Sequence, residues 1–118
     1  MNVQAILDVL SSSDIVQKIT VIVLVQEPGR QALRATALLE GGYVLHINEA
    51  SDRGFRRYSY HVQKGEKMMR RWDNAPQWPK IKTFPHHLHI HSERNVSECK
   101  EVFVQDVLDE MKTVIGSI

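Results

Sequence analysis

Cysteine is almost absent from this sequence of 118 residues, since Cys99 is the only one. A single cysteine excludes an internal disulfide and fits a reducing compartment. Long apolar runs are also absent, because the run over residues 15–25 is interrupted by Gln17, Lys18 and Thr20. It is shorter than the roughly 20 residues that a membrane-spanning helix needs. The first residues lack the basic and apolar regions of a secretory signal. We therefore expect a cytoplasmic protein that makes no contact with membranes.

What is present is typical of a globular protein. Hydrophobic residues make up 42% of the sequence and charged residues 25%, which are ordinary values for a folded domain. The length suits one domain over residues 1–118 with a core of its own. There is no internal repeat, low-complexity segment or interdomain linker. We therefore predict a single domain.

Hydrophobic spacing along the chain predicts an α+β fold. Asn2 is a suitable N-cap for a short first helix, and apolar residues from Val104 to Ile115 follow one face of a second helix. Alternating residues and turn signals predict about five or six strands between the helices. We place them over residues 15–27, 30–40, 43–48, 55–63, 66–73 and 88–91, with a loop over residues 49–54. Residues 30–40 also suit a helix, because their alanines and leucines are good helix formers. The predicted architecture is a meandering, mostly antiparallel sheet with the C-terminal helix packed on it.

The first predicted strand has apolar residues on both faces. Ile19, Val21 and Val23 alternate with Ile22 and Leu24. This pattern predicts a strand that lies centrally in the sheet or is covered on both sides. A homodimer interface could supply the second cover.

Charge is distributed unevenly, although the formal net charge is only +1. From Arg53 to Arg71, seven basic residues face the single acidic residue Glu66, which gives +6. From Ser92 to the end, the balance is −3. Clustered arginines provide both a positive field and bidentate donors for a polyanion. Solvated strand edges protected by basic residues explain the same pattern without a ligand.

One segment, residues 70–91, concentrates the residues best suited to a functional site. It contains both tryptophans, three of the four prolines and four of the six histidines. Turns and extended strand entries account for most of the prolines. They do not account for four histidines within the six positions from His86 to His91.

One chemistry for these histidines is proton transfer. Imidazole is the side chain that titrates near neutral pH, so a histidine could act as general acid or base on an RNA hydroxyl or leaving oxygen. Arginines would stabilise the charge of the phosphate, and an aromatic ring would stack on a base. The candidate aromatic residues are Trp72, Trp78 and Tyr60. No metal is required.

Two other interpretations remain open. His87, His89 and His91 with Asp73 could bind a divalent metal. Histidines that alternate along a strand are about 7 Å apart per step, so neighbours could share a metal but all three could not. The signal is weak without a cysteine pair or a His-Glu-x-x-His helix. Alternatively, the histidines form a hydrogen-bonded belt that joins strand to loop.

Two motifs resemble a known family. The run Arg71-Trp72-Asp73-Asn74-Ala75-Pro76, followed by Phe84-Pro85-His86-His87-Leu88-His89, resembles the TumE-like toxin family of toxin–antitoxin operons. The strand Tyr58-Ser59-Tyr60-His61 and the C-terminal amphipathic helix occur in the family's order. The likeness covers roughly residues 16–115. Trp72 and Leu88 stand where the family usually has tyrosine and lysine.

The resemblance implies a toxin that is neutralised by an antitoxin encoded nearby and that acts on RNA. We expect either a metal-independent endoribonuclease or an RNA-binding inhibitor of translation, with no cofactor and no metal. The expected catalytic residues are His86, His87, His89 and Asp73, and the expected nucleic-acid-binding residues are Arg57, Arg70, Arg71, Trp72 and His61. The alternatives are a non-enzymatic nucleic-acid or protein interaction module with structural histidines, and a His/Asp metal-binding domain.

Overall fold

A seven-stranded antiparallel sheet forms the centre of the computed structural model, which describes residues 2–116. Each strand pairs with its neighbours in the sequence, so the sheet is a simple meander. The strands are β1 (Val16–Glu27), β2 (Arg30–Leu39), β3 (Tyr43–Asp52), β4 (Phe55–Lys64), β5 (Lys67–Asp73), β6 (His87–Ile90) and β7 (Val96–Glu98). A short 3-10 turn, Glu40–Gly42, joins β2 to β3. The predicted fold class is confirmed, with seven strands in place of five or six.

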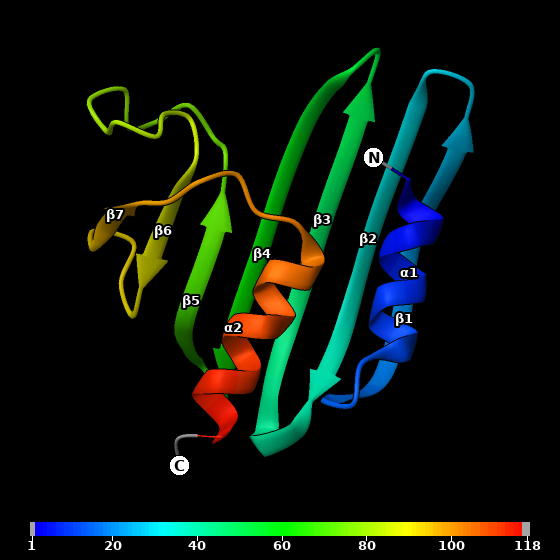
Figure 1. Cartoon of the computed structure of the whole chain (residues 1–118), viewed down its shortest axis with the longest axis horizontal. Helices are drawn as coiled ribbons and strands as arrows, with labels where there is room; N and C mark the ends of the chain where they lie inside the picture. Colours follow the sequence, from blue (N-terminus) through cyan, green and yellow to red (C-terminus); the bar gives the residue numbers. More distant parts are fainter. Residues whose placement is uncertain (1, 117–118) are drawn as a thin grey trace.

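Two helices lie on the same face of this sheet (Figure 1). Helix α1 (Val3–Ser12) begins at Asn2, whose Oδ1 accepts a hydrogen bond from the backbone N–H of Gln4 at 2.8 Å. Helix α2 (Val104–Gly116) is the predicted C-terminal helix. The chain between β7 and α2 crosses the helix-covered side of the sheet before α2 begins (Figure 1). We call this side the helix face.

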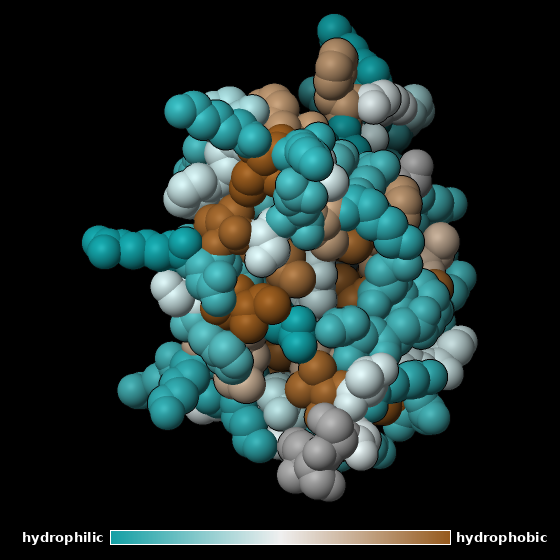
Figure 2. Space-filling model, turned by 60° about the vertical axis from the view of Figure 1, so that its left-hand side comes forward, coloured by the Kyte–Doolittle hydropathy of each residue, from teal (hydrophilic) through white to brown (hydrophobic). Residues whose placement is uncertain are grey.

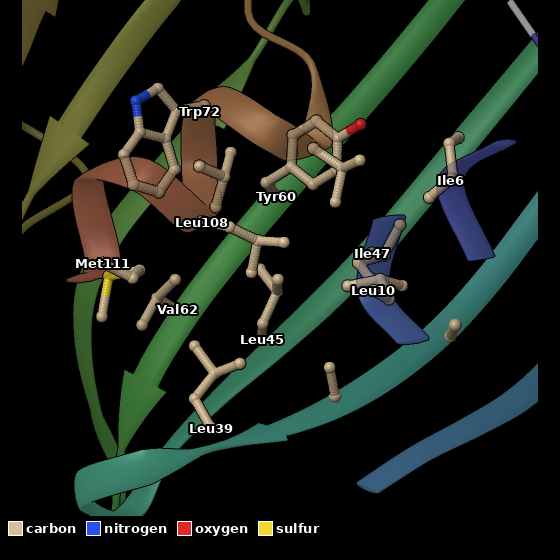
Figure 3. Close-up of a cluster of buried hydrophobic side chains, with 14 of the residues drawn as sticks. Ile6, Leu10, Leu39, Leu45, Ile47, Tyr60, Val62, Trp72, Leu108 and Met111 are labelled. Atoms are coloured by element: carbon tan, nitrogen blue, oxygen red, sulfur yellow. The ribbon is translucent and has the colours of Figure 1, made fainter. Parts of the chain in front are cut away.

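The core fills the space between the helices and the helix face. Period-two alternation places every second residue of β2, β3 and β4 on that face, and most of these residues are buried. Figure 3 shows side chains of α1 and α2 turned toward those of the sheet. The labelled side chains are Ile6, Leu10, Leu39, Leu45, Ile47, Tyr60, Val62, Trp72, Leu108 and Met111, all of which are buried.

Within residues 2–116, no helix covers the opposite side, which we call the open face. The same alternation places polar residues there, among apolar ones such as Leu38 and Val44, and the strand register aligns the polar residues in two rows across the sheet. One row is Arg34, Asn48, Ser59, Asp73 and His87, and the other is Thr36, His46, His61, Arg71 and His89. The antiparallel pairing therefore gathers polar side chains from five strands on one surface.

Strand β1 does not have the predicted position. It lies at the edge of the sheet and pairs only with β2. Its apolar residues Val21, Ile22, Val23 and Leu24 are between 36% and 59% exposed. The prediction of a central strand is therefore wrong. Cover by a second subunit stays a prediction.

Three other element boundaries differ from the predictions. Strand β3 continues to Asp52, so the loop predicted over residues 49–54 is a tight turn at Arg53 and Gly54. The short strand β7 (Val96–Glu98) was not predicted. His91 lies beyond the end of β6 with a φ of 63°, so it does not continue the strand alternation of His87 and His89.

The surface is mixed in character. Figure 2 shows apolar patches interrupting a mostly polar surface on one side of the molecule. Large side chains that are exposed outside β1 include Phe55, Trp78, Phe84 and Phe103. Within residues 2–116, no helix combines the length and the apolar character needed to cross a membrane.

Candidate functional site

A buried polar cluster lies where β5 meets β6 on the open face. Asp73 ends β5 and is paired in register with His87, the first residue of β6. His89 follows two positions later, so it points to the same face. Each of the three residues is only 2% exposed. We call these three residues the Asp73 cluster.

The polar atoms of the Asp73 cluster converge. Nε2 of His87 lies 3.0 Å from Oδ1 of Asp73, and Nε2 of His89 lies 3.8 Å from Oδ2 of the same carboxylate. The two imidazole rings meet edge to face, with their centroids 4.8 Å apart. One potential ligand atom from each residue lies within 4.8 Å of the others.

Backbone groups hold each side chain in place. Nδ1 of His87 lies 3.0 Å from the carbonyl oxygen of Pro85, and Nδ1 of His89 lies 2.9 Å from that of Glu93. Because a carbonyl oxygen only accepts, both Nδ1 atoms must carry the proton. Oδ1 of Asp73 accepts a hydrogen bond from the backbone N–H of Ala75 at 2.9 Å.

The cluster is incompletely satisfied despite its burial. Within residues 2–116, the buried side-chain nitrogen and oxygen atoms without a hydrogen-bond partner are Nε2 of His61, Nε of Arg71 and Nε2 of His87. All three lie on the open face. Nε of Arg71 is 3.1 Å from Oδ2 of Asp73, and its Nη1 is 3.1 Å from Glu93. Buried polar groups usually find partners, so this concentration points to a site that acts on something outside the chain.

The connection between β5 and β6 covers part of this cluster. Asn74 anchors its start, because its Oδ1 accepts from the N–H of Tyr58 and its amide donates to the carbonyl of Arg56. Further along, the indole of Trp78 meets the ring of His89 edge to face, with centroids 6.3 Å apart. Trp78 remains 36% exposed. An aromatic side chain therefore lies beside the buried histidines and is still open to solvent.

An adjacent pocket of about 360 Å³ opens on the same face. Its charged lining includes Arg34, Arg57 and Arg71, and Asp73 forms part of its wall. Within the described part of the chain, Arg34 and Arg57 form no ion pair, although the pocket lining also includes Glu49 and Asp73. The volume lies within the range typical of sites for small organic groups.

The arginines also affect a neighbouring histidine. Burial lowers the pKa of His61 below its usual value, and the proximity of His46 and the positive charge of Arg71 lower it further, while Glu93 opposes them. Imidazole in this position is therefore neutral at pH 7. The positive charge of the open face comes from its arginines.

The structure brings most of the predicted site residues together and separates three of them. Arg57, Arg71, His61, Asp73, His87 and His89 share the open face. On the helix face, Arg70 forms an ion pair with Glu110 at 3.3 Å and Trp72 is 4% exposed in the core. His86 lies at the end of the covering connection, where its Nδ1 is 2.8 Å from the hydroxyl of Tyr58.

Two pocket residues were missing from the predicted site. Arg34 and Asn48 line the pocket from β2 and β3. The sequence does indicate that Arg34 lies on a polar face of its strand, because it alternates with Leu33 and Ala35 on the apolar face. Without the strand pairing, however, no sequence pattern places β2 on the same surface as Asp73, some forty residues later.

Comparison with known proteins agrees with the resemblance seen in the motifs. The family model described as Toxin TumE matches residues 6–117, nearly the whole chain. The family predicted from the two motifs is thereby confirmed. A search of curated proteins and a search of solved structures gave no match.

Proposed function

The chain belongs to the Toxin TumE family, and we propose that this toxin acts on RNA, which it binds across the open face. A toxin of a toxin–antitoxin pair implies an antitoxin partner. The observation that carries the RNA proposal is the pocket in which Arg34, Arg57 and Arg71 converge beside Asp73. Arginine is the side chain best suited to phosphate, since its planar fork donates two parallel hydrogen bonds and keeps its charge.

Two features favour single-stranded RNA over a small anion. The polar rows extend over five strands, which gives a surface longer than one phosphate requires. Trp78 adds a partly exposed aromatic ring beside His89 of the cluster. Proteins that bind single strands combine a positive groove with aromatic rings on which bases stack. Trp78 takes the stacking role in this proposal, because Trp72 and Tyr60 are buried in the core.

The Asp73 cluster is the reactive centre in this proposal. Asp73 lines the pocket together with Arg57 and Arg71, and His87 and His89 lie beside its carboxylate, so a phosphate held by these arginines would lie next to the cluster. His86 is directed to Tyr58 and is left out of the reactive group. Arg70 is likewise left out, because its guanidinium is paired with Glu110 of α2.

Binding is tested with a fluorescently labelled single-stranded RNA at several salt concentrations. The double variant Arg34→Ala/Arg57→Ala should bind at least about tenfold more weakly, since each lost charged hydrogen bond costs about 1.5–3 kcal/mol. The slope of log affinity against log salt should fall by about 1.4, the value for two phosphate contacts on a single strand. Arg94→Ala is the matched control, because Arg94 is exposed in the turn after β6 and does not line the pocket. Equal affinity for wild type and the double variant would overturn the proposal.

Catalysis is tested separately by incubating total RNA with wild type and with His87→Ala. Shortened RNA with wild type alone supports a ribonuclease centred on the Asp73 cluster. RNA that is bound but stays intact supports an inhibitor that acts by binding. Equal cleavage by both proteins would remove the cluster from the mechanism.

A further inference from the structure

The Asp73 cluster combines a carboxylate with two imidazoles in a nearly solvent-free site. The three residues are each 2% exposed. Both Nδ1 atoms donate to backbone carbonyls, so on each ring Nε2 is the nitrogen that is left to act as an acceptor or a ligand beside the carboxylate. These two nitrogens and the carboxylate lie together at low dielectric. The guanidinium of Arg71, 3.1 Å from Oδ2 of Asp73, offsets part of the negative charge, but among residues 2–116 Nε2 of His87 still has no hydrogen-bond partner, which is unfavourable for a buried polar atom.

A hydrogen bond between His87 and Asp73 does not resolve the conflict. Their Nε2 and Oδ1 atoms are 3.0 Å apart, yet among residues 2–116 Nε2 of His87 has no hydrogen-bond partner. Because the ring donates from Nδ1 to Pro85, a neutral ring has no proton on Nε2 to donate to the carboxylate. A ring nitrogen and a carboxylate oxygen that lie close together without a hydrogen bond between them are placed as two ligands of one metal ion would be.

The spacing of the atoms matches that geometry. Zinc binds histidine nitrogen and carboxylate oxygen at about 2.0–2.1 Å in tetrahedral sites, which places neighbouring ligand atoms about 3.3 Å apart. The observed separations are 3.0 Å from Oδ1 of Asp73 to His87 and 3.8 Å from Oδ2 to His89. One ligand atom from each of the three residues lies within 4.8 Å of the others.

We propose that Nε2 of His87, Nε2 of His89 and the carboxylate of Asp73 bind a divalent transition metal of the zinc class. Two imidazole ligands and one carboxylate select such ions over magnesium and calcium, which prefer oxygen. The hydrogen bonds from Nδ1 to Pro85 and Glu93 are the outer-shell contacts that metal-binding histidines require, because they fix the tautomer and the orientation of the ring.

Three protein ligands leave a fourth coordination position on the metal. The role that we give this position rests on the proposed function and adds to it. Asp73 lines the arginine pocket, so a ligand from solvent can reach the metal from there. A site with three protein ligands and one open position is typical of catalytic metal centres, which polarise a phosphate oxygen or activate a water molecule. The guanidinium of Arg71, 3.1 Å from Oδ2 of Asp73, favours an anion in that position.

The test uses full-length protein without an affinity tag, stripped with a chelator and titrated with Zn²⁺ in the absence of RNA. We expect one equivalent to bind and the melting temperature to rise. Asp73→Asn and His89→Ala should each weaken binding at least tenfold and abolish the thermal shift. His91→Ala is the matched control, because His91 is exposed and lies outside the cluster, and it should bind like wild type.

Further measurements separate this inference from folding and from the RNA proposal. Circular dichroism should show that Asp73→Asn remains folded, and substitution with Co²⁺ should give the absorption of a tetrahedral nitrogen and oxygen site. If the wild-type protein binds neither Zn²⁺ nor Co²⁺ and its melting temperature does not change, the metal site is overturned, whatever the affinity for RNA. Equal loss of Zn²⁺ binding in His91→Ala and in His89→Ala would also overturn it. If Zn²⁺ binds normally but Arg34→Ala/Arg57→Ala has the same affinity for RNA as wild type, only the RNA proposal is overturned.

Discussion

Glu49 and Asp73 are both buried carboxylates, but they lie on opposite faces of the sheet and their surroundings differ. On the helix face, Glu49 is 3% exposed and accepts hydrogen bonds from Arg56 at 2.8 and 3.1 Å and from the hydroxyl of Tyr60. On the open face, Asp73 is 2% exposed and has beside it His87 and Arg71, both of which leave a buried nitrogen unsatisfied.

The Glu49 network is complete. Arg56 also donates to the carbonyl of Val102 at 2.8 Å and to Glu101 at 3.0 Å, and its guanidinium lies over the ring of Tyr58. Although burial works to lower it, the pKa of Arg56 is raised by its hydrogen bonds to Glu49 and by the charge of that carboxylate. The network thus joins β3 and β4 to the segment that leads into α2, and its role is to hold the helix face together.

The open face has the opposite design. Among residues 2–116, Arg34 and Arg57 form no ion pair, and the buried Nε2 of His87 forms no hydrogen bond to the carboxylate 3.0 Å away. Natural proteins satisfy most buried polar groups, so unsatisfied groups that are gathered in one place need an explanation outside the fold. Two carboxylates of almost equal burial thus have different surroundings, which indicates different roles. What distinguishes them is whether their buried polar atoms are hydrogen-bonded, which the exposed fraction does not show.

The same change of acid to amide in both carboxylates gives the largest expected contrast. Glu49→Gln should lower the free energy of unfolding by about 3 kcal/mol, because it removes the buried partner of a guanidinium. Asp73→Asn should lower it by about 1 kcal/mol or less, since the amide still accepts from Ala75 and can donate toward Nε2 of His87. Urea unfolding of both variants in the presence of a chelator measures the difference. Equal losses would show that Asp73 is as structural as Glu49.

Alkaline pH should weaken the helix face selectively. Burial raises the pKa of Tyr58 to about 12 from its usual value of 10, and burial and Glu49 raise the pKa of Tyr60 as well. The unfolded chain therefore loses these protons at lower pH than the folded chain, so stability is complete below pH 10 and falls as the pH rises to 12. Tyr58→Phe should make this fall shallower.

Unfolding curves at pH 9, 10, 11 and 12 provide the measurement. Tyr58→Phe should also cost about 1 kcal/mol at neutral pH, through loss of the hydrogen bond to His86. Asp73→Asn is the control from the open face, and its stability should fall between pH 10 and 12 as steeply as that of wild type. An equally steep fall in Tyr58→Phe would contradict the role given to the Tyr58 hydroxyl.

The smallest effect on stability is expected at the edge of the sheet. Ile22 is 59% exposed in β1, so Ile22→Lys should change the free energy of unfolding by no more than about 0.5 kcal/mol. The homodimer predicted from the sequence is tested by the same variant. Light scattering after gel filtration should find a dimer for wild type and a monomer for Ile22→Lys. A monomeric wild type would remove the dimer prediction.

Much of the fold followed from local patterns. The cap at Asn2, the amphipathic run that forms α2 and the alternation in β2 and β4 each predict an element from nearby residues alone. The helix alternative for residues 30–40 is wrong, because the residues form β2 between two partner strands. Strand β7 could not be predicted, since its three residues are extended through pairing with β6 and carry little signal of their own.

The site was predicted less completely, because alternation indicates that neighbours face opposite ways but does not say which way is outward. Arg70 and Arg71 are adjacent, yet one contacts α2 and the other the pocket. Trp72 and Asp73 divide in the same manner between the core and the open face. Placement of α2 on one side of the sheet decides these assignments, and that choice depends on packing of the whole chain.

By itself, the sequence determined the family, the α+β class and the concentration of histidines between residues 86 and 91. Motifs and periodicity are local properties, which one chain displays without folding. Only the tertiary structure decided that Asp73 meets His87 and His89, and that Arg34 joins Arg57 beside them. The register of antiparallel strands brings together residues that are distant in sequence, because pairing aligns side chains across the sheet.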